Sequence, residues 1–104
     1  MDPRFWGPSL WTTIHSMAAV YNPDQRHAFI QFIHLLPSIV PCYKCRIHLI
    51  DNLRNLPVEN FLKDNEQLFK WSYLLHDLVN KQLGKSSPRY AEVRQFYFSK
   101  MGRR

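Results

Sequence analysis

The chain has 104 residues, of which 45% are hydrophobic and 14% aromatic, and its formal net charge is +6. This apolar content excludes a disordered chain, and the length predicts a single domain over residues 1–104, with a structured core over about 6–97. No apolar run is long enough to span a membrane and no signal-peptide core follows the N-terminus, so we expect no membrane partner and synthesis without secretion.

Helical periodicity dominates the sequence, and no segment alternates as a strand would. We expect a first helix over about residues 8–21, preceded by a short lead-in. Trp11 and His15 are four positions apart on this helix and therefore project together. Taken singly, each is more simply explained as a core or helix-face residue than as a ligand contact.

Asn22 and Pro23 break the chain and predict the start of a second helix, which we expect to reach about Leu36. Its apolar residues lie nearly all round the helix. Such breadth predicts burial on two sides, in the core and at a dimer interface. Pro37 and Pro41 are expected to mark the end of this helix and the start of the next.

The only two cysteines, Cys42 and Cys45, form a Cys-x-x-Cys motif at the start of a helix expected over about residues 42–53. At this spacing the thiols lie about one helical turn apart and can close a disulfide. The positive end of the helix, together with Lys44 and Arg46, favours the thiolate. The motif predicts a redox dithiol, while half of a zinc site and two inert core cysteines remain as alternatives.

The fourth helix, expected over about residues 65–83, is the clearest element and carries two adjacent stripes of apolar and aromatic residues. His76 and Asn80 share one of its faces because they are four positions apart. Lys81 lies beside them, and Lys85 follows just past the end of the helix.

A short fifth helix is expected after Gly84, with Ser87 and Pro88 as its cap and first turn and Tyr90 on its apolar side. Basic residues crowd this last quarter of the chain; they are Lys81, Lys85, Arg89, Arg94, Lys100, Arg103 and Arg104. Such a cluster is typical of a nucleic-acid surface, a surface for an acidic partner or a site for a phosphate-bearing cofactor. A solvated basic face explains it equally well.

A zinc site built on two cysteines needs two histidines at short spacing. No pair has that spacing among the five histidines, which are His15, His27, His34, His48 and His76. Arg46 follows the second cysteine, which excludes covalent haem attachment, and the lack of strands excludes a thioredoxin-like fold. A redox dithiol in a helical domain then needs an electron acceptor, which a bound organic cofactor would supply.

Several side chains could hold such a cofactor. Aromatic and histidine rings that could stack on a flat ring system are those of Trp11, His15, Trp71, Tyr73, His76 and Tyr90. The cationic cluster of Lys81, Lys85 and Arg89 could face a pyrophosphate.

Three separated motifs also occur in a characteristic order. The first is Trp-Gly-Pro-Ser-Leu-Trp at residues 6–11, followed by His15; the second is Pro-Cys-Tyr-Lys-Cys at residues 41–45. The third begins at Trp71 and continues in the His-Asp-Leu-Val-Asn-Lys-Gln-Leu-Gly-Lys box at residues 76–85. In this order and at these distances they resemble the Erv/ALR family of FAD-linked sulfhydryl oxidases, which has Asn where this box has Asp.

The resemblance implies an all-α fold, namely a four-helix bundle with a short fifth helix that binds FAD, and a homodimer. It also implies that Cys45 is the sulfur next to the flavin, whereas Cys42 exchanges with the substrate. The residues implied in cofactor binding are Gly7, Trp11, His15, Tyr21, His48, Trp71, His76, Asn80, Lys81, Leu83, Lys85 and Tyr90. No metal ligand is implied.

The implied activity is the formation of disulfides in protein clients, coupled to the reduction of O₂ to hydrogen peroxide. The expected partners are O₂ and a thiol-bearing protein client or a small dithiol shuttle protein, but not nucleic acid. The chain is similar to the compact oxidases of large DNA viruses, which implies a place in the host cytoplasm or the virion. The alternative is a helical module that is held by zinc or binds nucleic acid through its basic surface.

Overall fold

The computed structural model describes residues 1–102, so Arg103 and Arg104 of the basic cluster lie outside the described residues. The elements in chain order are α1 (Pro3–Ala19), η1 (Pro23–Gln25), α2 (Arg26–Ile39), α3 (Tyr43–Asn55), η2 (Val58–Phe61), α4 (Asn65–Gln82) and α5 (Tyr90–Phe98). Residues 1–102 contain no strand, and the expected all-α fold is confirmed.

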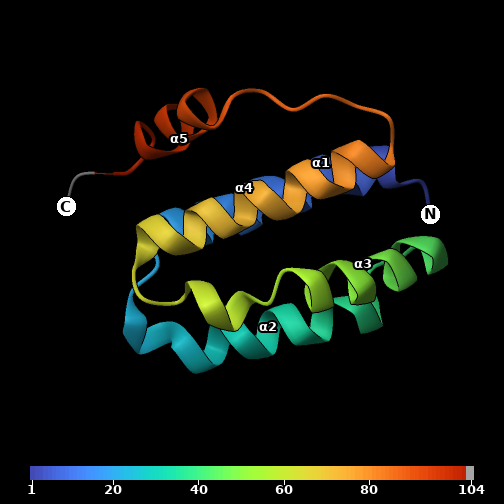
Figure 1. Ribbon diagram of the computed structural model, residues 1–104, viewed down its shortest axis with the longest axis horizontal. Coiled ribbons are helices and arrows are strands. Elements are labelled where there is room, and N and C mark those ends of the chain that lie inside the picture. Colours follow the sequence, from blue (N-terminus) through green and yellow to red (C-terminus); the bar gives the residue numbers. More distant parts are fainter. Residues whose placement is uncertain (103–104) are drawn as a thin grey trace.

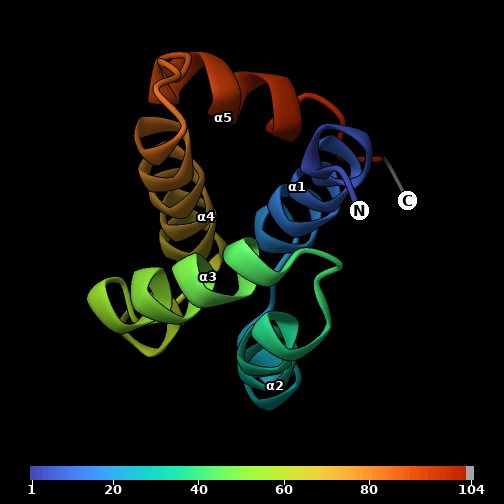
Figure 2. The same ribbon diagram turned by 90° about the vertical axis from the view of Figure 1, so that its right-hand side faces the viewer.

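The four long helices form two antiparallel pairs, in which α1 packs along α4 and α2 packs along α3 (Figure 1). The short α5 lies across α1 and α4, on the side away from α2 and α3 (Figure 2). The start of α1, the start of α3 and the end of α4 therefore meet at one end of the bundle. The expected four-helix bundle with a short fifth helix is confirmed.

The core is organised around α4, because this helix contacts α1, α5 and η2. Its Phe69 and Trp71 are the two largest fully buried side chains. The Trp71 indole Nε1 donates a hydrogen bond of 2.9 Å to the Leu56 carbonyl, so the buried ring leaves no polar atom without a partner. Tyr21 is buried in the same way and donates to the Leu62 carbonyl at 2.9 Å.

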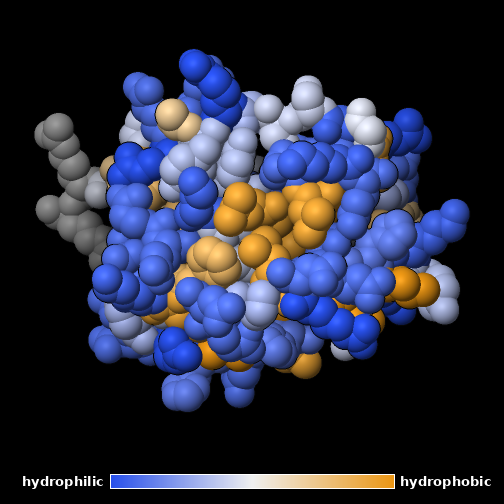
Figure 3. All heavy atoms as spheres, in the orientation of Figure 1, coloured by the Kyte–Doolittle hydropathy of each residue, from blue (hydrophilic) through white to orange (hydrophobic). Residues whose placement is uncertain are grey.

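Apolar side chains also reach the surface where the two helix pairs meet. On the face shown in Figure 3 they gather between α3 and α4, and hydrophilic side chains surround them. Leu49 and Leu53 of α3 are half-buried and pack against the core. Among residues 1–102, no helix combines the length and the apolar character that a bilayer crossing requires.

The first helix begins earlier than its pattern predicted, at Pro3 in place of a start near residue 8. Asp2 caps it by accepting a hydrogen bond of 2.8 Å from the Arg4 backbone N–H, and Pro3 stands in the first turn, where its missing N–H costs nothing. The expected non-helical lead-in was therefore wrong. Pro37 likewise lies inside α2, which continues to Ile39.

The fifth helix begins at Tyr90, later than the expected cap at Ser87. The physical reason is that the Ser87 hydroxyl is already engaged by α4, since it donates to the Asp77 carboxylate at 2.7 Å and accepts from Asn80 at 3.0 Å. It is not free to cap a helix. Gly84, at φ 72°, follows the end of α4 in the left-handed region that favours glycine, and the predicted stop is confirmed.

Candidate redox and cofactor site

Cys42 and Cys45 are joined in a disulfide at the start of α3, with their Cα atoms 5.2 Å apart. Cys42 is the N-cap residue of α3, and its Sγ accepts a hydrogen bond of 3.3 Å from the Cys45 backbone N–H. Both residues are half-buried, but Cys45 packs against the hydrophobic core. When the bond is reduced, the amide and the helix dipole favour the thiolate at Cys42.

The beginning of the chain holds the loop that carries this disulfide. The N-terminal ammonium of Met1 donates to the Pro41 carbonyl at 3.0 Å, and the Trp6 indole donates to the Met1 carbonyl at 3.3 Å. These bonds connect the start of α1 to the residue that precedes Cys42. The first two motifs of the sequence, which lie far apart along the chain, are therefore brought together.

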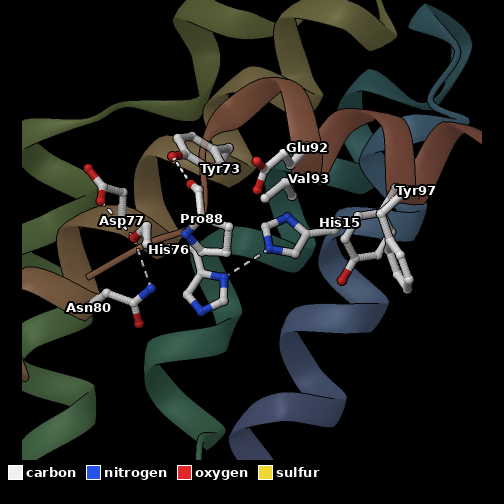
Figure 4. Close-up of a pocket in the computed structure, with 11 residues that line it drawn as sticks. His15, Tyr73, His76, Asp77, Asn80, Pro88, Glu92, Val93 and Tyr97 are labelled. Carbon is white, nitrogen blue, oxygen red and sulfur yellow. Dashed lines mark hydrogen bonds between the residues drawn. The ribbon is translucent and has the colours of Figure 1, made fainter. Parts of the chain in front are cut away.

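A cavity of about 310 Å³ lies between α1, α4, the segment after α4 and α5 (Figure 4). It is lined by His15, Tyr73, His76, Asp77, Asn80, Ser87, Pro88, Glu92, Val93, Phe96 and Tyr97. Its volume is within the range of small-molecule sites, and its lining combines aromatic rings with a few polar groups. Neither cysteine lines it.

His15 and His76 are hydrogen-bonded to each other at the inner wall of this cavity. His15 Nε2 lies 3.1 Å from His76 Nδ1, and His15 Nδ1 lies 2.9 Å from the Ser72 hydroxyl. The Trp11 ring stacks on His76, with centroids 4.1 Å apart and planes 9° from parallel. The third motif thus meets the first motif through direct ring contacts.

A second polar network holds the segment after α4 against that helix. The Ser87 hydroxyl links Asp77 and Asn80, and Lys81 forms an ion pair of 3.0 Å with Asp77. The bond from Ser87, followed by that from Lys81, holds the pKa of the Asp77 carboxyl below its usual value. Asp77 is therefore a charged residue of the cavity wall that binds both Ser87 and Lys81. These partners explain why an acidic residue fits where the family has Asn.

The structure distributes the other predicted site residues unevenly. Tyr21 and Trp71 lie in the core, and Gly7 is half-buried on α1 with open space beside it. Tyr90 packs edge-on against Tyr73, with ring centroids 5.2 Å apart. The remaining predicted residues are on the surface; they are His48, Lys81, Leu83 and Lys85.

Several residues of the cavity were missed by reasoning from the sequence. Those on α5 are Glu92, Val93, Phe96 and Tyr97. The helical spacing of Val93, Phe96 and Tyr97 indicated an apolar face, but nothing in the sequence showed that this face lies over His15. Ser72, which contacts His15, was also missed because a single serine inside a helix carries no local signal.

Comparison of the sequence with known proteins identifies its family. The model of the Erv1 / Alr family matches residues 8–98. The chain belongs to the Erv1/Alr family. A protein of Invertebrate iridescent virus 3 is 31% identical over 93% of this chain and 68% of its own length. A protein of Acanthamoeba polyphaga mimivirus is 34% identical over 89% of this chain and 68% of its own length. A protein of African swine fever virus is 29% identical over 88% of this chain and 79% of its own length. All three bear the name FAD-linked sulfhydryl oxidase.

The zinc-held alternative is not favoured in this Erv1/Alr domain. In the part of the chain from residue 1 to residue 102, no three His, Cys, Asp or Glu side chains come together in a way that would hold a metal ion. The two sulfurs that such a site would need are instead bonded to each other.

Burial of His15 predicts that the Erv1/Alr domain loses stability in acid. Desolvation, with a smaller contribution from His76, lowers the pKa of His15 from 6.5 to about 4. The unfolded chain takes up this proton near pH 6.5 and the folded chain only near pH 4, so stability falls as the pH drops between these values. We expect a loss of about 2 kcal/mol between about pH 7 and about pH 5.

Urea denaturation at the two pH values measures this loss. The variant His15→Gln should show a flatter pH dependence, whereas His27→Gln, at an exposed position of α2, should keep the wild-type dependence. An equal pH dependence in wild type and His15→Gln would contradict the assignment. His76 acts in the same direction, because burial and then Lys85 lower its pKa.

Proposed function

We propose that this chain is an FAD-linked sulfhydryl oxidase, which oxidises pairs of thiols to disulfides and transfers the electrons to O₂ with formation of hydrogen peroxide. The observation that carries the proposal is the closed Cys42–Cys45 disulfide at the N-terminus of a helix, in a domain of the Erv1/Alr family. Relatives from three viruses bear the name of this activity.

The residues present fit FAD in their chemistry. The cavity offers aromatic faces and polar edges for one end of a dinucleotide, and His76 Nε2 has no hydrogen-bond partner among residues 1–102. Because neither cysteine lines the cavity, the cavity residues and the disulfide would contact different parts of the cofactor. We propose that Trp11, His15, His76 and Asn80 hold the cofactor, with the exposed Lys85 beside its phosphates.

The other predicted cofactor residues are given lesser roles in this proposal. Tyr21 and Trp71 support the site from the core, where their polar atoms are satisfied by backbone carbonyls. Lys81 forms an ion pair with Asp77, and the negative charge of Asp77 weakens the attraction of Lys81 for a phosphate. Contacts of FAD with Gly7, His48, Leu83 and Tyr90 remain predictions of the family resemblance.

The thiol chemistry follows from the placement of the two sulfurs. A client thiolate attacks Cys42 Sγ, the Cys42–Cys45 bond breaks, and Cys45 leaves as a thiolate. The second client thiolate attacks the client sulfur of this mixed disulfide, which releases an oxidised client and returns Cys42 as a thiolate. Bound FAD supplies the two-electron acceptor for the dithiol and the route to O₂. Cys45 packs against the core and Cys42 is the N-cap, so we assign the inner role to Cys45 and the outer role to Cys42.

A flavin spectrum and an oxygen electrode test the proposed function. The purified protein should be yellow and should consume O₂ when dithiothreitol is added. It should produce one molecule of hydrogen peroxide for each O₂ consumed. A colourless protein that consumes no O₂ would overturn the proposal. Salt-sensitive DNA binding by such a protein would instead support the basic nucleic-acid-binding module.

We propose that the client is a protein with a pair of thiols, or a small dithiol shuttle protein, because a dithiol is the substrate that the Cys42–Cys45 disulfide can oxidise. We propose that the chain works in the cytoplasm, as implied by its resemblance to the compact viral oxidases. Recovery of a tagged copy from the secretory compartments of expressing cells would contradict this placement.

A homodimer is proposed through the outer face of α2. Leu35 and Ile39 are 60% and 69% exposed, and with Ala28 and Phe32 they follow one side of the helix without a charge. A second copy would cover this face by twofold symmetry. We expect Leu35→Asp to convert a dimer to a monomer in sedimentation analysis, whereas Ile50→Asp on α3 should leave the dimer intact. A wild-type chain that sediments as a monomer at high concentration would contradict the proposal.

A further inference from the structure

Ser72 has a hydroxyl whose single proton can be placed. The side chain is completely buried on α4, and its Oγ lies 2.7 Å from the Phe69 carbonyl and 2.9 Å from His15 Nδ1. A carbonyl has no proton, so the hydroxyl proton must occupy the contact with Phe69; otherwise two oxygen lone pairs would face each other. The Ser72 oxygen then accepts from His15, and the proton of that ring is on Nδ1.

The proton on His15 Nδ1 determines the state of His76. A buried, neutral His15 has only this one ring proton, so its Nε2 carries a lone pair. His76 Nδ1 lies 3.1 Å from that lone pair and must supply the proton between them. A neutral His76 therefore also carries its proton on Nδ1.

The hydrogen-bonded series from Ser72 through His15 ends at His76 Nε2, which has no hydrogen-bond partner among residues 1–102. His76 Nε2 points away from His15 in Figure 4, and the Trp11 ring stacked on His76 prevents the imidazole from turning freely. The nitrogen therefore presents a lone pair in a fixed direction. Such a group accepts a hydrogen bond but cannot donate one.

We propose that Ser72 is a positioning residue of the cofactor site: acting through His15, it holds His76 in the Nδ1–H form with Nε2 as a fixed hydrogen-bond acceptor. The ligand group that donates a hydrogen bond to this nitrogen is a hydroxyl or an amino group, and not a phosphate oxygen. This last step rests on the proposed binding of FAD, whose sugar hydroxyls and adenine amino group are donors of this kind. The assignment of the two tautomers does not depend on FAD.

Nuclear magnetic resonance of protein labelled with ¹⁵N in its histidines tests the tautomers directly. Correlations between the carbon-bound protons of the imidazole ring and its two nitrogens distinguish the Nδ1–H from the Nε2–H form. At neutral pH we expect the Nδ1–H pattern for both His15 and His76, with and without FAD. An Nε2–H pattern at His15 overturns the inference, even if the protein proves to be an FAD-linked oxidase.

Substitution of Ser72 tests its role. In Ser72→Ala we expect His15 and His76 to show mixed tautomers and the affinity for FAD to fall about five- to tenfold, as for one hydrogen bond lost. Ser72→Thr keeps the hydroxyl and should keep the wild-type tautomer pattern. Ser99→Ala is the matched control, since it removes a similar bond of 2.8 Å from a serine hydroxyl to a carbonyl three residues earlier, on α5.

The outcomes separate the two proposals. Unchanged tautomers in a folded Ser72→Ala variant overturn the role of Ser72, whereas absence of FAD binding in the wild type overturns the function but not the tautomers. If Ser72→Ala does not fold, the wild-type spectrum still decides the proton positions. Ser72→Thr with mixed tautomers would also count against the inference.

Discussion

Replacement of Cys45 by serine will abolish the oxygen uptake that dithiothreitol drives in the wild type. In the proposed mechanism Cys45 is the leaving sulfur of the disulfide and the one that faces the cofactor. Without it the disulfide cannot form, and a client thiol has no bond to attack. We expect the rate to fall by at least about a hundredfold, as for removal of a residue that reacts covalently. The oxygen electrode measures this loss, and equal uptake by wild type and Cys45→Ser would exclude the proposed route.

The two cysteines should also differ in their reactivity once each is left alone. Cys45→Ser keeps Cys42, whose sulfur is at the N-cap of α3 and accepts a hydrogen bond from the backbone N–H of residue 45. Cys42→Ser keeps Cys45, which packs against the core. We therefore expect the Cys42 thiol to react faster with a coloured aromatic disulfide reagent, because thiolate character and access both favour it. Faster reaction of the Cys45 thiol would reverse the assignment of inner and outer sulfur.

Retention of FAD in Cys45→Ser serves as the control for these measurements. The substitution exchanges one atom at a half-buried position, so the bundle and the cavity should be preserved. A variant that keeps its yellow colour and loses oxygen uptake has lost chemistry and not structure. A variant that loses its colour as well must be reconstituted with FAD before its rate is compared.

Phe69→Ala will cause a large loss of stability while leaving the disulfide intact. The Phe69 ring is completely buried on α4 and lies 5.8 Å, centroid to centroid, from His15 of α1. It also contacts the rings of Tyr97 and Phe98 on α5, at 5.7 Å and 5.2 Å. Truncation of such a residue costs about 3–5 kcal/mol, which is a large part of the stability of a small domain.

Thermal unfolding measures this effect, and we expect a fall in Tm of more than about 10 °C. Phe5→Ala is the matched control, because Phe5 is 76% exposed on α1 and should change the Tm little. Since Phe69 connects α5 to α1 and α4, the variant should also bind FAD more weakly than wild type. A Tm within about 2 °C of the wild type would show that α5 does not depend on this ring.

Local patterns account for the elements and for the disulfide. The helical period predicted all four long helices, because an amphipathic stripe needs only the residues of its own segment. The spacing of Cys42 and Cys45 placed both sulfurs on one turn for the same reason, and the structure joins them. The error at the start of α5 arose because Ser87 has a distant partner in Asp77. The early start of α1, by contrast, rests on the local cap at Asp2 and Pro3.

The candidate site depended on contacts that no local pattern contains. The family resemblance implied cofactor binding for Trp11, Trp71 and Tyr21 alike, and no local pattern separates their roles. Only the packing places Trp11 on His76 at the cavity wall and the other two in the core with their polar atoms satisfied.

By itself, the sequence determined that this protein is helical, that it carries a dithiol at the start of a helix, and that its motifs are those of the Erv/ALR family. The tertiary structure alone decided which side chains share the cavity, because α5 crosses α1 and α4 through contacts between residues far apart in the chain. Ser72 and His15 are 57 positions apart, and their bond of 2.9 Å exists only once α1 lies along α4. Buried hydrogen-bond partners decide which ring nitrogen of His15 and of His76 carries the proton, and burial arises only in the folded molecule.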